Sequence, residues 1–317
     1  ELWRKGLGEA RMGRTQKIGS SANSSPITDG KHVFAYFKSG TLAALDFDGA
    51  VAWRINVEEV LAPDGMLWDK GTSPIFAGGR IVIAAMQEKS LSYLAALDKA
   101  TGTKVWLTER KSDAVGETCD SYTTPFVMTL DGVETIVTWG ADCLTGHDAQ
   151  SGRQLWTCGG FNPDKIGNWR NIASAVGSGD VAIVPYGRED LVAGIRMGGS
   201  GDITGKAWLW KHAGWGTDAA TPAAADGKAL VLCDRGKERG TLTYLETENG
   251  KIIWQQQLPK SVHNFCSSPL IAGKRLVVAR QDGMVFTGTI TGEGVTELQE
   301  IQLDDGLIAS PVPVDGR

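Results

Sequence analysis

Apolar and polar residues alternate with a period of two in short runs along most of the 317-residue chain. Residues 96–106, ALDKATGTKVW, alternate on both sides of a polar turn and end on a tryptophan. This pattern predicts two antiparallel strands joined by a tight turn in which Gly102 takes a positive φ. No segment keeps a 3.6-residue period beyond about one turn, so the sequence predicts an all-β fold.

The hairpin pattern recurs along the chain. Similar stretches occupy residues 44–53, 146–156 and 244–254, and an eroded copy without the tryptophan occupies 288–298. Each repeat also opens with Ser-Pro or Thr-Pro before an apolar strand, except the fourth, which has Ser174-Ala175. Four short strands in about 45–50 residues are the spacing of a β-propeller blade.

One tryptophan ends the hairpin of each repeat except the eroded copy. We assign these residues to packing between neighbouring blades, because large rings fill wedge-shaped gaps well. They are Trp3, Trp53, Trp106, Trp156, Trp210 and Trp254.

The two ends of the chain match different parts of one repeat. Residues 1–7 resemble its end and residues 309–317 its start, so a last blade is expected to be shared between the termini. Its middle strands are expected after Arg317, which leaves this blade incomplete. We therefore predict one seven-bladed β-propeller domain of four-stranded antiparallel blades over residues 1–317. The predicted blades span 21–57, 70–109, 121–158, 171–212, 218–257 and 265–303, with 307–317 plus 1–7 as the seventh.

The stretch ALDKATGTKVW resembles the tryptophan-docking motif of pyrroloquinoline quinone (PQQ)-type propellers, and the resemblance covers the whole chain. That family includes quinoprotein dehydrogenases, BamB-type lipoproteins of outer-membrane assembly and secreted bacterial propellers. Residues 24–46, 198–204 and 309–317 are similar to stretches of the secreted group. The resemblance implies a periplasmic or secreted bacterial protein, and the name PQQ-like describes the repeat rather than a ligand.

The sequence departs from the catalytic members of the family. In quinoprotein dehydrogenases, PQQ lies between a tryptophan and a disulfide of adjacent cysteines, beside Ca²⁺ held by Glu, Asn and Asp. None of the five cysteines here adjoins another, the four histidines have no metal-ligand spacing, and no nucleophile–base pair is recognisable. We expect a non-catalytic protein without cofactor or metal. The alternative is a quinoprotein-type oxidoreductase with PQQ and Ca²⁺ over Trp68, Trp169 or Trp215.

Cys143 and Cys158 flank the third hairpin symmetrically. If its turn is a four-residue loop, the two residues lie opposite each other and a cross-strand disulfide is geometrically allowed. A bulged turn would shift the register by one residue and prevent the bond. The glycine-rich stretch 198–205 is interpreted as an insertion in the fourth hairpin, because no helix is expected after it to bind phosphate.

Charge and hydropathy narrow the range of partners. The net charge of −5 does not indicate nucleic-acid binding. No apolar run approaches the roughly 20 residues of a membrane-spanning helix. No basic and apolar leader precedes the first repeat, which begins partway through its pattern.

The loops that lead from one blade to the next, here called inter-blade loops, share one face with the turns between second and third strands. Function commonly resides in such loops on a rigid scaffold. The candidate residues in the inter-blade loops are Trp68, Tyr122, Trp169, Arg170, Asn171, Trp215, His263 and Asn264.

Four turns between second and third strands also carry a basic residue, namely Lys38, Arg188, Arg235 and Arg280. A ring of such residues favours an anionic ligand. However, lysine and arginine are common in exposed turns, and neighbouring Asp142, Asp190, Asp234 and Asp282 offer them partners. We predict an extracytoplasmic scaffold that binds a protein partner or a small anionic ligand through this face. The further alternative is a sensor for anionic small molecules or carbohydrates.

Overall fold

The computed structural model describes residues 2–11, 20–188 and 190–313. The chain forms two compact units. The first contains residues 1–170 with 198–203, and the second contains residues 171–197 with 204–317.

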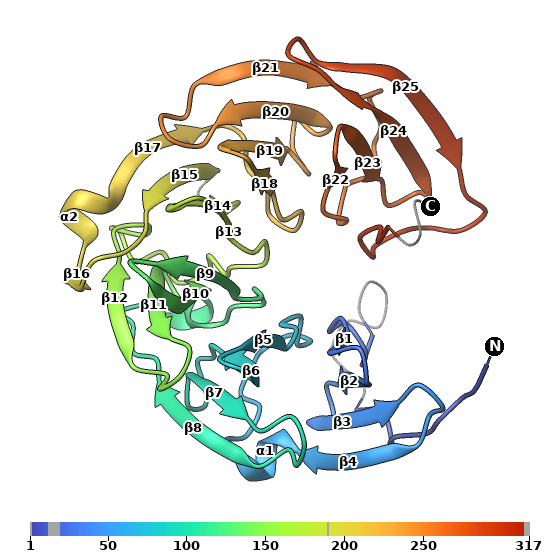
Figure 1. Cartoon of the computed structure of the whole chain (residues 1–317). Coiled ribbons are helices and arrows are strands. Elements are labelled where there is room, and N and C mark those ends of the chain that lie inside the picture. The colour runs from blue at the N-terminus through green and yellow to red at the C-terminus, as the bar shows by residue number, and fades with distance from the viewer. Residues whose placement is uncertain (1, 12–19, 189, 314–317) are drawn as a thin grey trace. The chain divides into compact units, whose positions relative to one another are not determined.

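The first unit holds three antiparallel sheets in which the strands follow one another in chain order, the arrangement of a propeller blade (Figure 1). Blade one comprises β1 (Ile27–Thr28), β2 (His32–Tyr36), β3 (Thr41–Asp46) and β4 (Val51–Asn56). Blade two comprises β5 (Ile75–Ala77), β6 (Arg80–Ala85), β7 (Tyr93–Leu97) and β8 (Lys104–Glu109). Blade three comprises β9 (Phe126–Leu130), β10 (Val133–Gly140), β11 (Cys143–Asp148) and β12 (Gln154–Cys158).

The second unit repeats this arrangement three times. Blade four comprises β13 (Val176–Ser178), β14 (Val181–Tyr186), β15 (Leu191–Arg196) and β17 (Trp208–Ala213). Blade five comprises β18 (Ala223–Ala225), β19 (Lys228–Leu232), β20 (Thr241–Glu246) and β21 (Ile252–Gln257). Blade six comprises β22 (Leu270–Ala272), β23 (Arg275–Ala279), β24 (Met284–Ile290) and β25 (Val295–Gln302).

The all-β prediction and the blade architecture are thus confirmed. The helical segments in the described residues are the single turns α1 (Val57–Val60), η1 (Gly116–Cys119) and α2 (Thr204–Ala207). Residues 2–11 and 307–313 form no strand, so the shared seventh blade stays a prediction, and parts of it, residues 1 and 314–317, lie outside the described residues.

The glycine-rich stretch lies between β15 and β17, as predicted for an insertion in the fourth hairpin, but it also forms secondary structure of its own. Residues Gly201–Asp202 form β16, which pairs in parallel with β12 and adds a fifth strand to blade three. Residues 198–203 therefore belong to the first unit, although they connect β15 to β17. A helix does follow the insertion, but α2 is only four residues long, too short to build an anion site.

The predicted turn of the hairpins is confirmed at Gly102, which has a φ of +72°. Each hairpin also contains a bulge, which shifts the strand register by one residue next to the pair that includes the motif tryptophan. In blade three this bulge pairs Cys158 with Leu144 rather than with Cys143. The expected opposition of Cys143 and Cys158 is therefore wrong, and both are free thiols.

Five of the motif tryptophans contact the next repeat, and the assignment of Trp156 to the joint between blades stays a prediction. In four of them the indole N–H donates to a carbonyl in the following hairpin turn, and the rings of Trp3, Trp53, Trp106 and Trp210 cover the turn glycine. The hydrogen bonds are Trp3 to Phe47 (2.7 Å), Trp53 to Lys99 (2.8 Å), Trp210 to Thr247 (2.7 Å) and Trp254 to Thr291 (3.0 Å). Trp106 lies against Gly152 and Trp156 lies over Gly146 in the same sheet.

The Ser/Thr-Pro markers have a matching role. Each backbone N–H at the marker donates to the hydroxyl of the marker in the next blade, which links the innermost strands within a unit. In the first unit these are Ser25 to Ser73 (2.9 Å) and Ser73 to Thr124 (3.0 Å). In the second they are Ser174 to Thr221 (2.9 Å), Thr221 to Ser268 (3.1 Å) and Ser268 to Ser310 (2.9 Å).

The hydrophobic core of each unit lies between consecutive blades, where alternate residues of facing strands interdigitate. Polar side chains that are buried between blades, and the inter-blade loops, are the candidates for a functional site.

Candidate functional site

Three inter-blade loops of the first unit meet at Glu117. Trp68 lies between α1 and β5, Glu117 lies in η1, and Arg170 ends the loop after β12. The indole N–H of Trp68 and the guanidinium of Arg170 both donate to Oε1 of Glu117, at 2.7 and 2.8 Å. The Arg170 guanidinium carbon lies 5.5 Å from the Trp68 ring centroid, a cation–π distance. We call these three residues the Trp68 cluster.

The loop that carries Trp68 is held from below by Asp120. The buried Asp120 carboxylate accepts the N–H of Leu67 at 2.9 Å and the N–H of Glu88 at 2.8 Å. Burial raises the pKa of Asp120 although both backbone hydrogen bonds lower it. Tyr122 is also buried here and lies against Gly71 of the same loop, and burial raises the pKa of its hydroxyl.

A second contact fixes the two loops that supply Glu117 and Arg170. The N–H of Glu117 donates to the carbonyl of Gly167 at 2.7 Å. Gly116 has a φ of +58°, and a Cβ there would be 2.8 Å from the Gly167 oxygen, so only glycine allows this approach. An ion pair between Lys165 and Asp113 joins the same loops at the surface.

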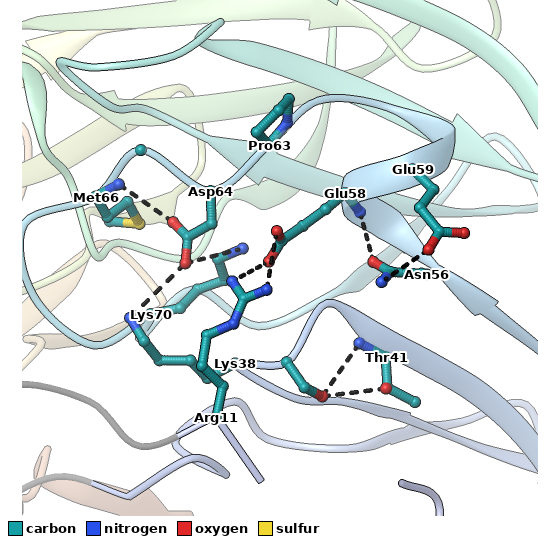
Figure 2. A network of polar contacts seen from close by, with 12 residues as sticks. Arg11, Lys38, Thr41, Asn56, Glu58, Glu59, Pro63, Asp64, Met66 and Lys70 are labelled. Atoms are coloured by element: carbon teal, nitrogen blue, oxygen red, sulfur yellow. Dashed lines mark hydrogen bonds and ion pairs between the residues drawn. The ribbon is translucent and has the colours of Figure 1, made fainter. Parts of the chain in front are cut away.

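Beneath the Trp68 loop lies a network of opposite charges, shown in Figure 2. Lys38, from the turn after β2, donates to the carbonyl of Trp68 at 3.1 Å and lies 3.4 Å from a carboxylate oxygen of Asp69. Asp64 lies between Lys38 (3.7 Å) and Lys70 (4.0 Å). Their side chains are at most 11% exposed, so each charge needs its partner.

The network ends at a tyrosine. Lys70 donates to the hydroxyl of buried Tyr36 at 2.8 Å and lies over its ring. Burial lowers the pKa of Lys70, and nearby Asp64 and Glu58 oppose that shift. Arg11 pairs with Glu58 through two hydrogen bonds, of 2.5 and 3.1 Å. These contacts fasten the Trp68 loop and residues near Arg11 to blade one.

The second unit brings together Arg188 and Arg235 around one carboxylate. Asp218 lies 3.2 Å from Nε of Arg188 and 3.4 Å from Nη1 of Arg235. The Arg235 guanidinium also donates to the carbonyl of Gly187. Buried Asp234 accepts three backbone N–H groups, from Asp218 and the two residues after it, which holds the loop in place.

Arg280 lies in blade six with its own partner. It donates to both carboxylate oxygens of Asp282, at 2.9 and 3.0 Å, and to the carbonyl of Pro259. His263 and Asn264 are exposed in the loop nearby, and the carbonyl of Asn264 accepts the N–H of Gln281 at 2.9 Å. All four predicted bases, Lys38 included, thus have a carboxylate partner, which reduces the positive field expected of them.

The other candidates occupy different surroundings. Trp215 is half-buried and stacks on His212 with ring centroids 4.2 Å apart. Trp169 is half-buried and Asn171 is buried. The sequence therefore named Trp68, Tyr122 and Arg170, which do come together, but missed Glu117, which joins two of them. Glu117, in the stretch GETCD, could have been noticed in the sequence, because a cation such as Arg170 in a neighbouring loop needs a carboxylate partner.

A bound PQQ–Ca²⁺ pair is not matched by these residues. Among the described residues, no group of three or more His, Cys, Asp and Glu side chains is arranged to hold a metal ion. All five cysteines are free and none adjoins another. The absence of a cofactor stays a prediction. No helix in the described part of the chain is both long and apolar enough to span a membrane.

The chain belongs to the PQQ-like repeat family whose model (PQQ_2) is described as "Outer membrane protein assembly factor BamB". The family model matches residues 1–157, 94–201 and 200–297. These overlapping matches reach across both units, so the predicted family resemblance is confirmed.

Two curated relatives bear the name outer membrane protein assembly factor BamB. The chain is 22% identical to the protein of Yersinia pestis over 281 residues, which are 86% of this chain and 62% of that protein. It is 28% identical to the protein of Burkholderia pseudomallei (strain K96243) over 223 residues, 67% of this chain and 49% of that protein. The chain thus spans about half to three fifths of their length.

Solved structures support the fold. BamB from Moraxella catarrhalis matches with a TM-score of 0.62 at 16% identity, covering 90% of this chain and 78% of that one. A europium-containing methanol dehydrogenase matches with a TM-score of 0.65 at 10% identity, covering 91% and 70%. At such identities the likeness concerns the propeller fold alone, which binding and catalytic proteins share.

Proposed function

We propose that this protein is a non-catalytic, extracytoplasmic propeller that binds a protein partner, as an assembly factor for outer membrane proteins, and that the Trp68 cluster is its binding surface. The observation that carries the proposal is membership, over residues 1–297, of the family described as an outer membrane protein assembly factor. The relatives' name supports a periplasmic location at the outer membrane.

The chemistry of the Trp68 cluster supports its assignment as the binding surface. Tryptophan and arginine are the residues that most often dominate binding energy at protein interfaces. Here Glu117 and the backbone contacts of Asp120 hold both side chains in place before any partner arrives, which lowers the entropy lost on binding. The side chains of Arg170 and Glu117 are 23% and 19% exposed, so a partner can still cover them.

The test is affinity purification of the tagged chain from a bacterial envelope fraction, with quantification of the proteins that copurify. The double variant Trp68→Ala and Arg170→Ala is compared with Phe47→Ala. Phe47 is also an exposed aromatic residue but lies in the β3–β4 hairpin turn, at the opposite end of the blade from the inter-blade loops. We expect an outer-membrane or periplasmic partner that is lost from the double variant and retained by Phe47→Ala.

A partner retained equally by both variants would contradict the Trp68 cluster as the binding surface. Absence of any envelope partner from the unmodified chain would contradict the function itself. The alternative of a sensor for anionic ligands gains no specific support, because each predicted base has a carboxylate partner.

A further inference from the structure

One backbone hydrogen bond recurs where blades one, two, four, five and six end. The residue after the fourth strand donates its N–H to the carbonyl just before the third strand, and in blades one, two and five its side chain lies against the next blade. We call it the plug residue. The plug residues with this bond are Val57, Arg110, Gly214, Leu258 and Leu303.

Where the plug residue is apolar, the gap is an ordinary core. Val57 is fully buried and packs in a cluster with Ile81 and Ile83 of blade two. Leu258 is fully buried in a cluster with Val278 and Phe286 of blade six. No space remains for a ligand at these positions, since burial of apolar side chains fills it.

Arg110 fills the gap between blades two and three with a guanidinium group. It is 3% exposed, yet among the described residues its guanidinium donates to hydroxyl, carbonyl and sulfur atoms and to no carboxylate. Its nitrogens donate to Oγ1 of Thr145 (3.0 Å) and to the carbonyls of Gly140 (2.8 Å) and Cys143 (2.7 Å). Carbonyl and hydroxyl dipoles of the next blade therefore form a complete guanidinium receptor.

Gly214 leaves the equivalent gap between blades four and five unfilled. A cavity of about 270 Å³ lies there. Gly214 has a φ of +86°, a backbone conformation that disfavours any side chain. The cavity is lined by Ala213, Gly214, Trp215, Cys233, Glu238, Thr241, Thr243 and Gln255.

The wall of this cavity repeats the receptor around Arg110. In the register of the two blades, Gly140, Cys143 and Thr145 of blade three correspond to Cys233, Thr241 and Thr243 of blade five. All three corresponding residues line the cavity. Blades that face an apolar plug residue instead have Ala95 or Phe286 at the position of Thr243. A threonine hydroxyl at this position is therefore found beside Arg110 and beside Gly214.

The surroundings favour a cation. Burial raises the pKa of Cys233 to about 11, and the carboxylates of Asp234, Asp190 and Glu238 add to that shift. Only the contribution of these three carboxylates favours a positive group, because burial disfavours any charge. Glu238 is exposed at the rim, where its carboxylate is available to pair with an incoming guanidinium.

We propose that the cavity between blades four and five binds the guanidinium group of an arginine side chain supplied by a partner protein. The side chain occupies the place that Arg110 fills from within the chain, with Thr243 Oγ1 and the carbonyls of Cys233 and Thr241 as acceptors. Each of these oxygens already accepts one hydrogen bond, from Gln255 Nε2, the Gly240 N–H and the Cys233 N–H respectively. The guanidinium uses the second lone pair of each oxygen. The Trp215 indole, which also lines the cavity, contacts the bound group. This site belongs to the second unit and is independent of the Trp68 cluster.

The experiment is a calorimetric titration of the whole chain with N-acetyl-L-arginine methylamide, which carries the side chain as a protein would. The matched probes are N-acetyl-L-citrulline methylamide, a neutral analogue of the same shape, and free L-arginine. We expect saturable binding of the arginine probe, at least tenfold tighter than the citrulline probe, because charged hydrogen bonds are the stronger ones. No saturation up to about 10 mM, or equal binding of the citrulline probe, would overturn the proposal.

Variants locate the site. Thr243→Val and Glu238→Gln should each weaken binding at least fivefold, whereas Thr296→Val, on exposed β25, should leave it unchanged. Glu238 is exposed, so Glu238→Gln serves as the test if Thr243→Val fails to fold. Unchanged binding by both site variants would show that the probe binds elsewhere. Binding of free L-arginine alone would overturn a protein side chain as the ligand.

Discussion

The ring of Trp53 occupies the space in which Gly102 lacks a side chain. A Cβ at Gly102 would be 2.8 Å from the Trp53 ring, and the Trp53 indole N–H donates to the carbonyl of Lys99 in the same turn. The same pairing of tryptophan and turn glycine recurs at Trp3 with Gly49, and at Trp210 with Gly250. The repeat therefore encodes both halves of the joint between neighbouring blades.

Gly102→Ala should destabilise the first unit by about 2 kcal/mol more than Gly79→Ala. Both glycines have nearly the same φ, +72° and +73°, but a Cβ at Gly79 would meet nothing within 4 Å. The control thus carries the backbone strain without the clash against Trp53. Urea denaturation of both variants measures the difference. Equal losses would show that the contact with the tryptophan does not constrain the turn.

Glu117→Ala should release the Trp68 side chain. Loss of the shared carboxylate removes the hydrogen bonds from Trp68 and Arg170, and stability should fall by about 1–2 kcal/mol. Acrylamide quenching of tryptophan fluorescence, compared with and without Trp68→Phe, reports the exposure of this one ring. Glu109→Ala, an exposed carboxylate in β8, is the control and should leave quenching unchanged. Quenching that Glu117→Ala does not increase would contradict the role of this carboxylate.

His147 should make the protein less stable in mild acid. Burial lowers its pKa to about 4, with Arg110 adding to the effect, while its hydrogen bond to the carbonyl of Gly152 opposes it. Because the unfolded chain takes up a proton near pH 6.5 and the folded chain only near 4, stability falls as the pH drops through this window. The loss reaches about 3 kcal/mol near pH 4.

The matched variant is His147→Leu, since leucine holds this position in other repeats, at Leu45, Leu97 and Leu245. Chemical denaturation at pH 7, 5.5 and 4 should show a smaller loss in the variant than in the unmodified chain. Parallel losses would mean that His147 is not the group responsible, and that the carboxylates dominate the acid response.

Arg110→Ala should be strongly destabilising, by about 3 kcal/mol, because it empties a gap lined with carbonyls. Guanidinium ion at tens of millimolar should raise the melting temperature of the variant and not that of the unmodified chain. Ammonium and urea at the same concentration are the controls. A variant that guanidinium does not rescue would contradict the description of this gap as a guanidinium receptor.

The fold could be predicted from the sequence because the same pattern of strands and turns recurs several times along the chain. Period-two strands, turn glycines and motif tryptophans agree in most repeats, so a copy that lacks one signal, such as 288–298, is recognised from the others. The Cys143–Cys158 register failed for a local reason. It depended on whether one residue bulges at the turn, and Leu144 occupies the position opposite Cys158.

The candidate site was only partly predictable. Aromatic and basic residues in the inter-blade loops stand out in composition, which identified Trp68 and Arg170. Glu117 and Asp120 act through contacts 49 and 53 residues away along the chain, with Trp68 and Leu67, and such pairings depend on how neighbouring loops fold together. The gap at Gly214 likewise emerges only when the blades are compared in register.

Photocrosslinking in living cells tests most directly whether a protein partner binds at the Trp68 cluster. A benzoyl-phenylalanine replaces Trp68 in one strain and Phe47 in another, and crosslinked proteins are identified by mass spectrometry. We expect one envelope protein to be crosslinked from position 68 and not from position 47, with the yield reduced by Arg170→Ala. A crosslink from position 47 alone, or none from either position, would contradict protein binding through the Trp68 cluster.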